Sequence, residues 1–307
     1  MSITLCAPRY VLGEILTDHA ELKGFSDVVE DRGMVPDPDL WGWGAVHRTA
    51  LDTATLAVRA GRLTLDAAGV GPGDIDAVVL CSSTFPADVA DHGELVRSLL
   101  QGLRLGPVPV TGVTLNRCAN LLTGLQLAAG TLAARRHRRV LVITTDRVTV
   151  ESDRIADFAL FSDGAASCLM TREPSATPES YVWVGDAQAQ DPAALGGSHE
   201  ISADLARIAD RKALAQAGIG LDTIDALMHN NIFLPIVTIK ELQAGFDPSQ
   251  LDTSNITRVG HCFAADPLIN LADRWSAGGV RPGGHYLLAS SVPGLRASCL
   301  LRAVDHS

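Results

Sequence analysis

The sequence predicts an α/β protein built from two similar halves. Residue patterns with helical spacing alternate with short, wholly apolar runs that are typical of buried strands. The segment 68–86 recurs as 217–235, with seven of nineteen aligned positions identical and a constant offset, so that Asp76 and Asp225 lie 149 residues apart. Because each copy follows a helical run, the repeat indicates duplication of a whole α/β unit.

In the first half, the elements alternate in order along the chain. Helices are predicted where small and apolar residues recur every three or four positions, and strands where four or more apolar residues run together. The predicted elements are an opening strand within 3–13, an irregular loop over 21–45, a helix over 48–68, a strand ending at Cys81, a helix over 87–103, a strand over 108–114, a helix over 119–136 and strands over 140–143 and 167–170.

The second half repeats this order. A segment rich in Pro, Ser and Thr, 174–179, predicts a linker that divides the chain into halves 1–173 and 180–307. After it come a helical run over 204–217, a strand ending at Met228, a helix over 267–277 and a strand over 286–289.

Composition excludes several classes of function. With 307 residues, 47% of them hydrophobic, and a formal charge of −10, the chain is globular and an unlikely nucleic-acid partner on charge grounds. Its six scattered cysteines include no C-x-x-C pair, so we expect reduced thiols and no metal site. Neither a signal peptide nor a run of eighteen apolar residues is found, which predicts a cytoplasmic protein without a membrane span.

The most informative single residue is Cys118. It lies between a short segment of mixed polarity and the start of a predicted helix. The free N–H groups and the positive dipole at the N-terminus of a helix favour the thiolate form of a cysteine. A cysteine at this point is therefore either a nucleophile or, as cysteines often are, a buried packing residue.

Two histidines fall at strand ends or loops of the second half. His229 follows a buried strand at the position that Leu80 holds in the first half, and His261 lies in the loop equivalent, within about a residue, to that of Cys118. Cysteine with imidazole is the minimal set for covalent acyl transfer, since the thiolate attacks a carbonyl and imidazole moves the proton. Each histidine alone is equally compatible with packing.

Several segments together carry a family resemblance: Leu115–Gly124, Asp163–Ala166, His229–Asn231, Gly260–His261 and Leu287–Gly294. In order and spacing the chain resembles the thiolase-fold superfamily, and within it the ketoacyl-ACP synthase III-like (FabH-like) condensing enzymes and acyltransferases. The resemblance implies a five-layered αβαβα sandwich, a homodimer, and Cys118 accepting an acyl group from acyl-CoA or an acyl carrier protein. No permanently bound cofactor is implied.

The same resemblance suggests roles for other residues. His229 matches the histidine of the family's H-x-x-N element, and His261 stands where synthase III enzymes carry an asparagine that holds the malonyl carbonyl. Arg154 falls near an arginine that stacks on the CoA adenine, with Trp41 or Trp43 as its aromatic partner. Basic residues on one helix are candidates for contacting the carrier or its phosphopantetheine: Arg207, Arg211 and Lys212.

The chain also departs from the family pattern. A set of Cys118, His229 and His261 resembles that of the elongating ketosynthases, whereas His261 with the nearby Asp266 resembles synthase III-like acyltransferases of antibiotic pathways. Arg117 replaces a small residue and either favours the thiolate or is a solvated charge. Asn231 is a further candidate for tuning the site. Pro293 occupies the closing turn that usually supplies an oxyanion N–H, and proline has none to give.

We therefore expect an acyltransferase that carries its acyl group on Cys118, in specialised-metabolite biosynthesis. A decarboxylated malonyl thioester, giving a 3-oxoacyl product, is the favoured acceptor on the sequence. The alternatives are non-decarboxylating transfer to a hydroxyl or amine, for example of a sugar, and a catalytically silent partner subunit of an active ketosynthase. These alternatives can be distinguished by experiment, because only condensation with a malonyl thioester releases carbon dioxide.

Overall fold

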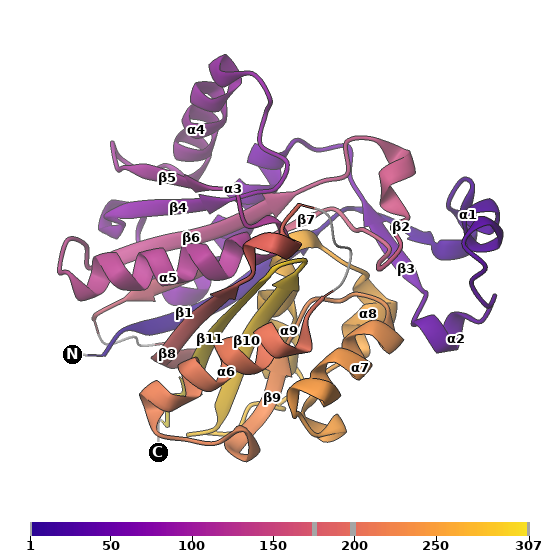
Figure 1. Ribbon diagram of the computed structural model, residues 1–307. Coiled ribbons are helices and arrows are strands. Elements are labelled where there is room, and N and C mark those ends of the chain that lie inside the picture. Colours follow the sequence, from indigo (N-terminus) through magenta and orange to yellow (C-terminus); the bar gives the residue numbers. More distant parts are fainter. Residues whose placement is uncertain (1, 174–176, 197–200, 306–307) are drawn as a thin grey trace.

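The fold is seen in a computed structural model that describes residues 2–173, 177–196 and 201–305. Residues 174–176 of the predicted linker lie outside the described residues. Figure 1 shows a broad twisted sheet with helices on its faces and a smaller lobe, containing α1 and α2, at one side. Among the described helices, none is long and apolar enough to cross a bilayer.

The strands are β1 (Thr4–Leu12), β2 (Ile15–Asp18), β3 (Ala45–Arg48), β4 (Ala77–Cys81), β5 (Val110–Val113), β6 (Arg139–Asp146), β7 (Gly164–Thr171), β8 (Ser180–Gln190), β9 (Ile224–Met228), β10 (His285–Val292) and β11 (Leu295–Ala303). The α-helices are α1 (Phe25–Asp31), α2 (Pro38–Trp41), α3 (Thr53–Ala68), α4 (Val89–Leu103), α5 (Asn120–Ala133), α6 (Ala203–Ala217), α7 (Leu234–Ala244), α8 (Ser254–Val259) and α9 (Asp266–Ser276). Two short 3₁₀ turns, η3 (Arg117–Ala119) and η8 (Phe263–Ala265), precede α5 and α9.

Nine of these strands form one mixed sheet in the order β5-β4-β6-β7-β1-β8-β11-β10-β9. The two halves meet where β1 pairs antiparallel with β8. In the first half β4 and β6 are parallel and β6 and β7 antiparallel; in the second, β9 and β10 are parallel and β10 and β11 antiparallel. The strand order thus follows the same plan twice, as the sequence repeat indicates, while the boundaries 1–173 and 180–307 stay a prediction.

The helices form layers on this sheet. Helix α5 packs on β4 and β6 of the first half and on β11 and β10 of the second, and α9 likewise contacts β1 and β9. These two helices therefore lie between the halves, while α3 covers β1, β6 and β7 from outside and α6 covers β8 and β11. The predicted α/β fold of five layers is confirmed, and the loops before α5 and α9 are brought to the centre of the molecule.

The duplicated helices α3 and α6 begin and end alike. Asp52 and Ser202 accept backbone N–H bonds at the two N-termini, and Gly69 and Gly218 close the C-termini with φ of 63° and 67°. That left-handed conformation is the one glycine adopts without a Cβ penalty, which explains why the repeat retains a glycine at this point.

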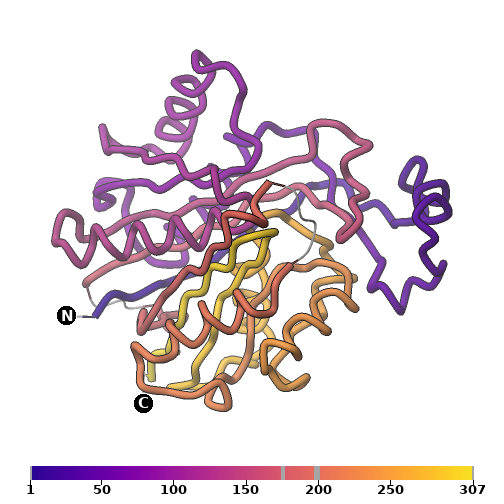
Figure 2. The backbone as a smooth tube through the Cα atoms, in the orientation of Figure 1, coloured from indigo at the N-terminus to yellow at the C-terminus, as the bar shows by residue number. Residues whose placement is uncertain are grey.

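The segment predicted to be irregular, 21–45, is more ordered than expected. It contains α1, α2 and the start of β3, and with the β2–β3 hairpin it projects from the main body (Figures 1 and 2). Its apolar side chains form their own core around Phe25 and Trp43, continued by Phe233. A few aromatic anchors thus order a lobe whose sequence has little periodicity.

Candidate active site

Cys118 lies in η3, directly before the central helix α5. The residue before it, Arg117, has a φ of 52°, so the chain turns sharply and presents the thiol at the helix start. The turn is held by Asn120, whose side-chain oxygen accepts the N–H of Asn116 at 2.9 Å. Of the six cysteines, Cys118 is half-buried and the other five are buried.

The loop before α9 has the same local geometry. Phe263 has a φ of 50°, and Asp266 accepts the N–H of Cys262 at 2.7 Å as Asn120 does in the first half. This correspondence pairs Cys118 with Ala264. The histidine of this loop therefore stands three residues before the true counterpart of Cys118, rather than about one as the sequence repeat suggested, and so its side chain is free to face the thiol.

Cys118, His261 and Asp266 form a chain of polar contacts. Nε2 of His261 lies 3.2 Å from Sγ of Cys118, and Nδ1 lies 2.5 Å from Oδ2 of Asp266. The side chains of His261 and Asp266 are 1% and 0% exposed. Asp266 also accepts the backbone N–H of Asn231 at 2.7 Å. A nucleophile in contact with a base, itself oriented by a carboxylate, is the arrangement of a catalytic triad.

The charges around His261 control its protonation. Burial by itself would lower the pKa of His261, but the negative charges of Asp266 and Cys118, and the hydrogen bonds to both, raise that pKa to about 10. The imidazole is therefore a cation at neutral pH, and a cation in contact with the sulfur favours a thiolate.

The backbone under His261 is fixed by two features. Gly260 has a φ of 70° and a ψ of −163°, and a Cβ there would lie 2.8 Å from the carbonyl oxygen of Leu160. His261 then pairs with the segment before β7, donating its N–H to Leu160 at 2.8 Å and accepting that of Ser162 at 2.9 Å. Only glycine fits the turn that delivers this histidine.

A cavity of about 360 Å³ opens over the thiol and is mostly apolar. Its lining residues are Arg117, Cys118, Phe158, Leu195, Gly196, Ile201, Asn230, Ile232, His261, Ser291, Val292 and Pro293. Apolar walls with a few converging polar groups are the usual form of a small-molecule site.

The second predicted histidine does not line this cavity. His229 is 1% exposed, its Nδ1 lies 2.7 Å from the backbone oxygen of Asn230, and burial lowers its pKa. The next residue, Asn230, lines the cavity instead. The sequence placed Asn230 in the polar segment His229–Asn231 but assigned it no role, because nothing in the sequence shows which of these side chains faces a cavity.

The closing turn lies at the cavity rim. Arg117 donates from a guanidinium nitrogen to the carbonyl oxygen of Pro293 at 2.5 Å, and thereby ties the turn to the nucleophile loop. Among the described residues Arg117 has no carboxylate partner. It thus contributes a positive charge at the cavity wall beside Cys118.

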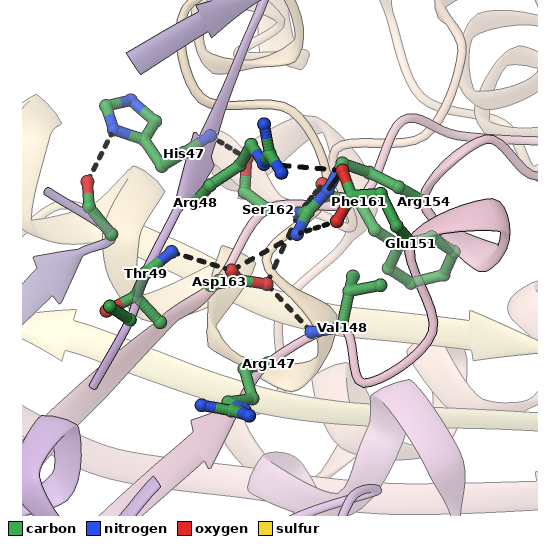
Figure 3. Close-up of polar contacts among 12 residues, drawn as sticks. His47, Arg48, Thr49, Arg147, Val148, Glu151, Arg154, Phe161, Ser162 and Asp163 are labelled. Carbon is green, nitrogen blue, oxygen red and sulfur yellow. Dashed lines mark hydrogen bonds and ion pairs between the residues drawn. The ribbon is translucent and has the colours of Figure 1, made fainter. Parts of the chain in front are cut away.

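The geometry argues against the suggested role of Arg154 in stacking on CoA. Its guanidinium is buried, contacts Glu151 at 3.0 Å and Asp163 at 3.2 Å, and donates to the carbonyl oxygen of Phe161 at 2.9 Å (Figure 3). Asp163 in turn accepts the N–H groups of Thr49 and Val148. Arg154 therefore supports the turn beneath His261, and it is not exposed to a nucleotide.

The remaining candidates lie away from the thiol. Trp41 and Trp43 stack at 6.0 Å, and Trp43, which is buried, lines a separate cavity of about 680 Å³ in the α1–α2 lobe. Arg207, Arg211 and Lys212 lie on α6, where Arg207 pairs with Asp204, and none of the three lines the Cys118 cavity. In the described part of the chain, no three His, Cys, Asp or Glu side chains are grouped to hold a metal.

Comparisons with known proteins agree with the fold and the nucleophile loop. The family described as 3-oxoacyl-acyl-carrier-protein (ACP) synthase III matches residues 114–186. A β-ketoacyl-acyl-carrier-protein synthase III of Nitratidesulfovibrio vulgaris is 26% identical over 323 residues, covering 90% of this chain and 96% of that protein. One from Streptomyces coelicolor is 27% identical over 274 residues, covering 79% and 80%.

Solved structures share the fold over almost the whole chain. FabH from Pseudomonas aeruginosa has a TM-score of 0.79 at 18% identity, covering 99% of both chains. A variant of Xanthomonas campestris OleA with bound lauric acid and lauroyl-CoA has a TM-score of 0.82 at 15% identity, covering 98% and 99%. ChlB3, described as an acyltransferase, has a TM-score of 0.81 at 19% identity, covering 99% and 98%.

The fold and these relatives define an enzyme of the transferase kind on the thiolase fold. Within that class, the chain is similar to FabH and to other proteins of the ketoacyl-ACP synthase III type. The resemblance predicted from the sequence is thereby confirmed.

Proposed function

We propose that this protein is an acyltransferase that loads an acyl group from a CoA or carrier-protein thioester onto Cys118 and passes it to a hydroxyl or amine. The observation that carries the proposal is the contact of His261 with both Cys118, at 3.2 Å, and Asp266, at 2.5 Å. A base oriented by a carboxylate is what an acceptor that must lose a proton requires.

Loading would begin with the Cys118 thiolate attacking the carbonyl carbon of the donor thioester. A carbon–sulfur bond forms and the carbonyl electrons move to oxygen. When the intermediate collapses, the donor thiolate leaves and takes the proton of the His261 imidazolium. The products are the acyl–Cys118 thioester and a free donor thiol, with a neutral imidazole.

Transfer would use that neutral imidazole. His261 takes the proton of the acceptor hydroxyl or amine as its oxygen or nitrogen attacks the acyl carbon, and Asp266 stabilises the imidazolium that results. Collapse releases the Cys118 thiolate and restores the starting ion pair. Each half of the reaction is balanced in atoms and protons without any further reagent.

The sequence favoured a malonyl thioester as acceptor, and one observation still supports condensation as a second candidate. The Asn230 side chain lies on the same cavity as His261, and two donors facing one carbonyl would stabilise an enolate. The contact of His261 with the Asp266 carboxylate favours simple transfer, because it prepares His261 to act as a base. Condensation needs no such base, since decarboxylation itself produces the enolate. A silent partner subunit is disfavoured, since it has no use for an oriented thiol–imidazole pair.

The donor stays open between CoA and a carrier protein. The relatives include an OleA variant with bound lauroyl-CoA and enzymes named for the acyl carrier protein, so both classes of thioester are candidates. Trp43 remains a candidate for contact with the donor, because its buried indole N–H has no acceptor among the described residues and the side chain lines the 680 Å³ cavity.

The test is intact-protein mass spectrometry after incubation with a panel of acyl-CoA and acyl-carrier thioesters. Wild type should gain the mass of one acyl group, and Cys118→Ala should gain none. Addition of alcohol or amine acceptors should then remove the acyl group, whereas malonyl-CoA should not. Release of carbon dioxide with malonyl-CoA would instead select condensation, and no adduct with any donor would refute acyl transfer.

A further inference from the structure

The amide nitrogen of Asn230 is a buried donor for which the described part of the chain offers no acceptor. The residue is 4% exposed and lines the cavity of Cys118 and His261. An unpaired buried amide N–H is costly, typically by about 1–3 kcal/mol, and in native proteins it marks a site whose partner is supplied by something else.

The orientation of this amide is fixed by its oxygen. The backbone N–H of Ser291 donates to Oδ1 of Asn230 at 3.0 Å, and the hydroxyl of Ser290 lies 2.8 Å from the same oxygen. A flipped amide would place its NH₂ group against the Ser291 N–H, two donors facing each other. Nδ2 is therefore held on the side away from β10.

The same contact links Asn230 to the nucleophile. The Ser290 hydroxyl is also 2.8 Å from the carbonyl oxygen of Cys118, so one hydroxyl joins the two loops. Ser291 is in turn held by the buried Arg296, which donates to its hydroxyl at 3.0 Å. Asn230 is thus anchored on rigid elements, as a group that acts by position must be.

His229 is a rival for this role, because among the described residues its buried Nε2 likewise has no hydrogen-bond partner. However, this histidine is not among the described residues that line the cavity, and the charges that act on it are those of Glu241, Lys240 and Asp266. His261, by contrast, is acted on by Cys118 directly. His229 therefore belongs to the buried polar layer behind the site.

We propose that Asn230, rather than His229, is the catalytic hydrogen-bond donor of this site, and that its Nδ2 binds the oxygen of the reacting acyl carbonyl. The inference rests on the proposed function, acyl transfer through Cys118. As the thiolate attacks, the carbonyl oxygen becomes an oxyanion, and the fixed N–H lies ready to stabilise it without reorganisation.

This role fills a gap left by the closing turn. Pro293 lines the cavity but has no N–H, so that residue cannot donate to an oxyanion. A side-chain amide projecting from the opposite loop supplies a donor of the same chemistry. The backbone N–H of Cys118 is the complementary donor, because it lies at the start of a helical segment and no acceptor for it is found among the described residues.

The experiment compares matched variants at adjacent positions. Asn230→Leu removes the donor in a side chain of similar size, and His229→Leu introduces the residue that the first half carries at the equivalent position, Leu80. Asn230→Asp is the second test variant, since it keeps the oxygen that Ser291 needs and lacks the N–H when ionised. Thermal unfolding checks that each variant folds.

Two rates are measured on each protein. Acylation of Cys118 by p-nitrophenyl acetate and by hexanoyl-CoA passes through an oxyanion, whereas alkylation of Cys118 by iodoacetamide does not. Their ratio cancels any change in thiolate content. We expect the ratio to fall by on the order of 100-fold or more in both Asn230 variants, and to stay within about three-fold of wild type in His229→Leu.

The outcomes separate this inference from the proposed function. If the Asn230 variants keep the wild-type ratio of acylation to alkylation, the role of Asn230 is overturned and acyl transfer stays intact. The same conclusion follows if His229→Leu lowers this ratio as much as the Asn230 variants do. A wild-type enzyme that is alkylated at Cys118 but takes no acyl group from either donor would refute acyl transfer itself, and this inference with it.

Discussion

The substitution Asp266→Asn would test the relay most directly. Asp266 accepts three contacts with two oxygens: the N–H groups of Cys262 and Asn231, each at 2.7 Å, and Nδ1 of His261 at 2.5 Å. Asparagine has one oxygen and one NH₂ group in the same volume. One of the two backbone N–H groups would then face another donor, which costs about 1–3 kcal/mol and lowers Tm by a few degrees.

The larger effect is electrostatic. The Asp266 charge is the largest contribution that raises the pKa of His261 to about 10, against burial, which lowers it. Without that charge the pKa falls, and the imidazolium beside Cys118 is lost at neutral pH. Since an unpaired thiol is only a few per cent thiolate at pH 7, alkylation of Cys118 should slow by up to roughly 30-fold. Acyl transfer should fall further, by on the order of 10³-fold or more, because the base also loses its orientation.

The assay is the rate of Cys118 alkylation by iodoacetamide between pH 5 and 10, followed by mass spectrometry. At neutral pH alkylation should be faster in wild type than in Asp266→Asn, because only wild type keeps the imidazolium beside the sulfur. Asp52→Asn, a helix-cap change in which asparagine serves as well as aspartate, is the matched control. Superimposable profiles for wild type and Asp266→Asn would refute the reasoning.

Three further predictions follow from the packing. Arg154→Ala should lower the free energy of unfolding in urea by about 3–5 kcal/mol, because Asp163 is left buried without its partner, and Arg154→Lys should recover part of it. Gly260→Ala should abolish acylation while Cys118 remains present, since a Cβ would lie 2.8 Å from the Leu160 carbonyl; normal acylation would contradict this. The predicted homodimer would use the end strand β5 and Leu115, which is 91% exposed, so that Leu115→Lys should shift the mass measured by light scattering from dimer towards monomer; an unchanged dimer mass would refute this interface.

The sequence was most informative where the internal repeat is matched by the order of secondary-structure elements. The 149-residue repeat predicted one α/β plan used twice, and the sheet order bears this plan out. It also predicted that the loops of Cys118 and His261 would correspond. Because α5 and α9 share the central layer, corresponding loops lie at neighbouring helix starts, and the thiol and the imidazole meet.

The sequence was less informative where the direction of a single side chain decides what it contacts. His229 and Asn230 are adjacent, and composition cannot tell that Asn230 rather than His229 is among the described residues that line the cavity. Arg154 was expected near the CoA adenine, yet it forms a buried ion pair with Asp163, which lies nine positions further along the chain. An arginine followed within about ten residues by an aspartate in a mostly apolar segment, as Arg154 is by Asp163, is a sequence signal for a buried ion pair.

The charge balance at His261 also predicts an order of events. In the free enzyme the Cys118 thiolate is one of the charges that raise the pKa of His261 to about 10, so the imidazolium persists at neutral pH and is lost only as the pH rises towards that value. The stability that this cation contributes is likewise complete below about pH 6.5, the ordinary histidine value, and lost between there and about 10.

Acylation of Cys118 removes the sulfur's negative charge, and the pKa of His261 must then fall, since burial and Asp266 are left to oppose each other. Loading needs the cation and should fail as the pH approaches 10, whereas transfer needs the neutral base and should rise with pH over a lower range. Single-turnover measurements of the two steps against pH test this. If the rates of loading and transfer change over the same pH range, the Cys118 thiolate does not control the protonation of His261. If they change over separate ranges, His261 becomes a base only after the acyl group has been loaded.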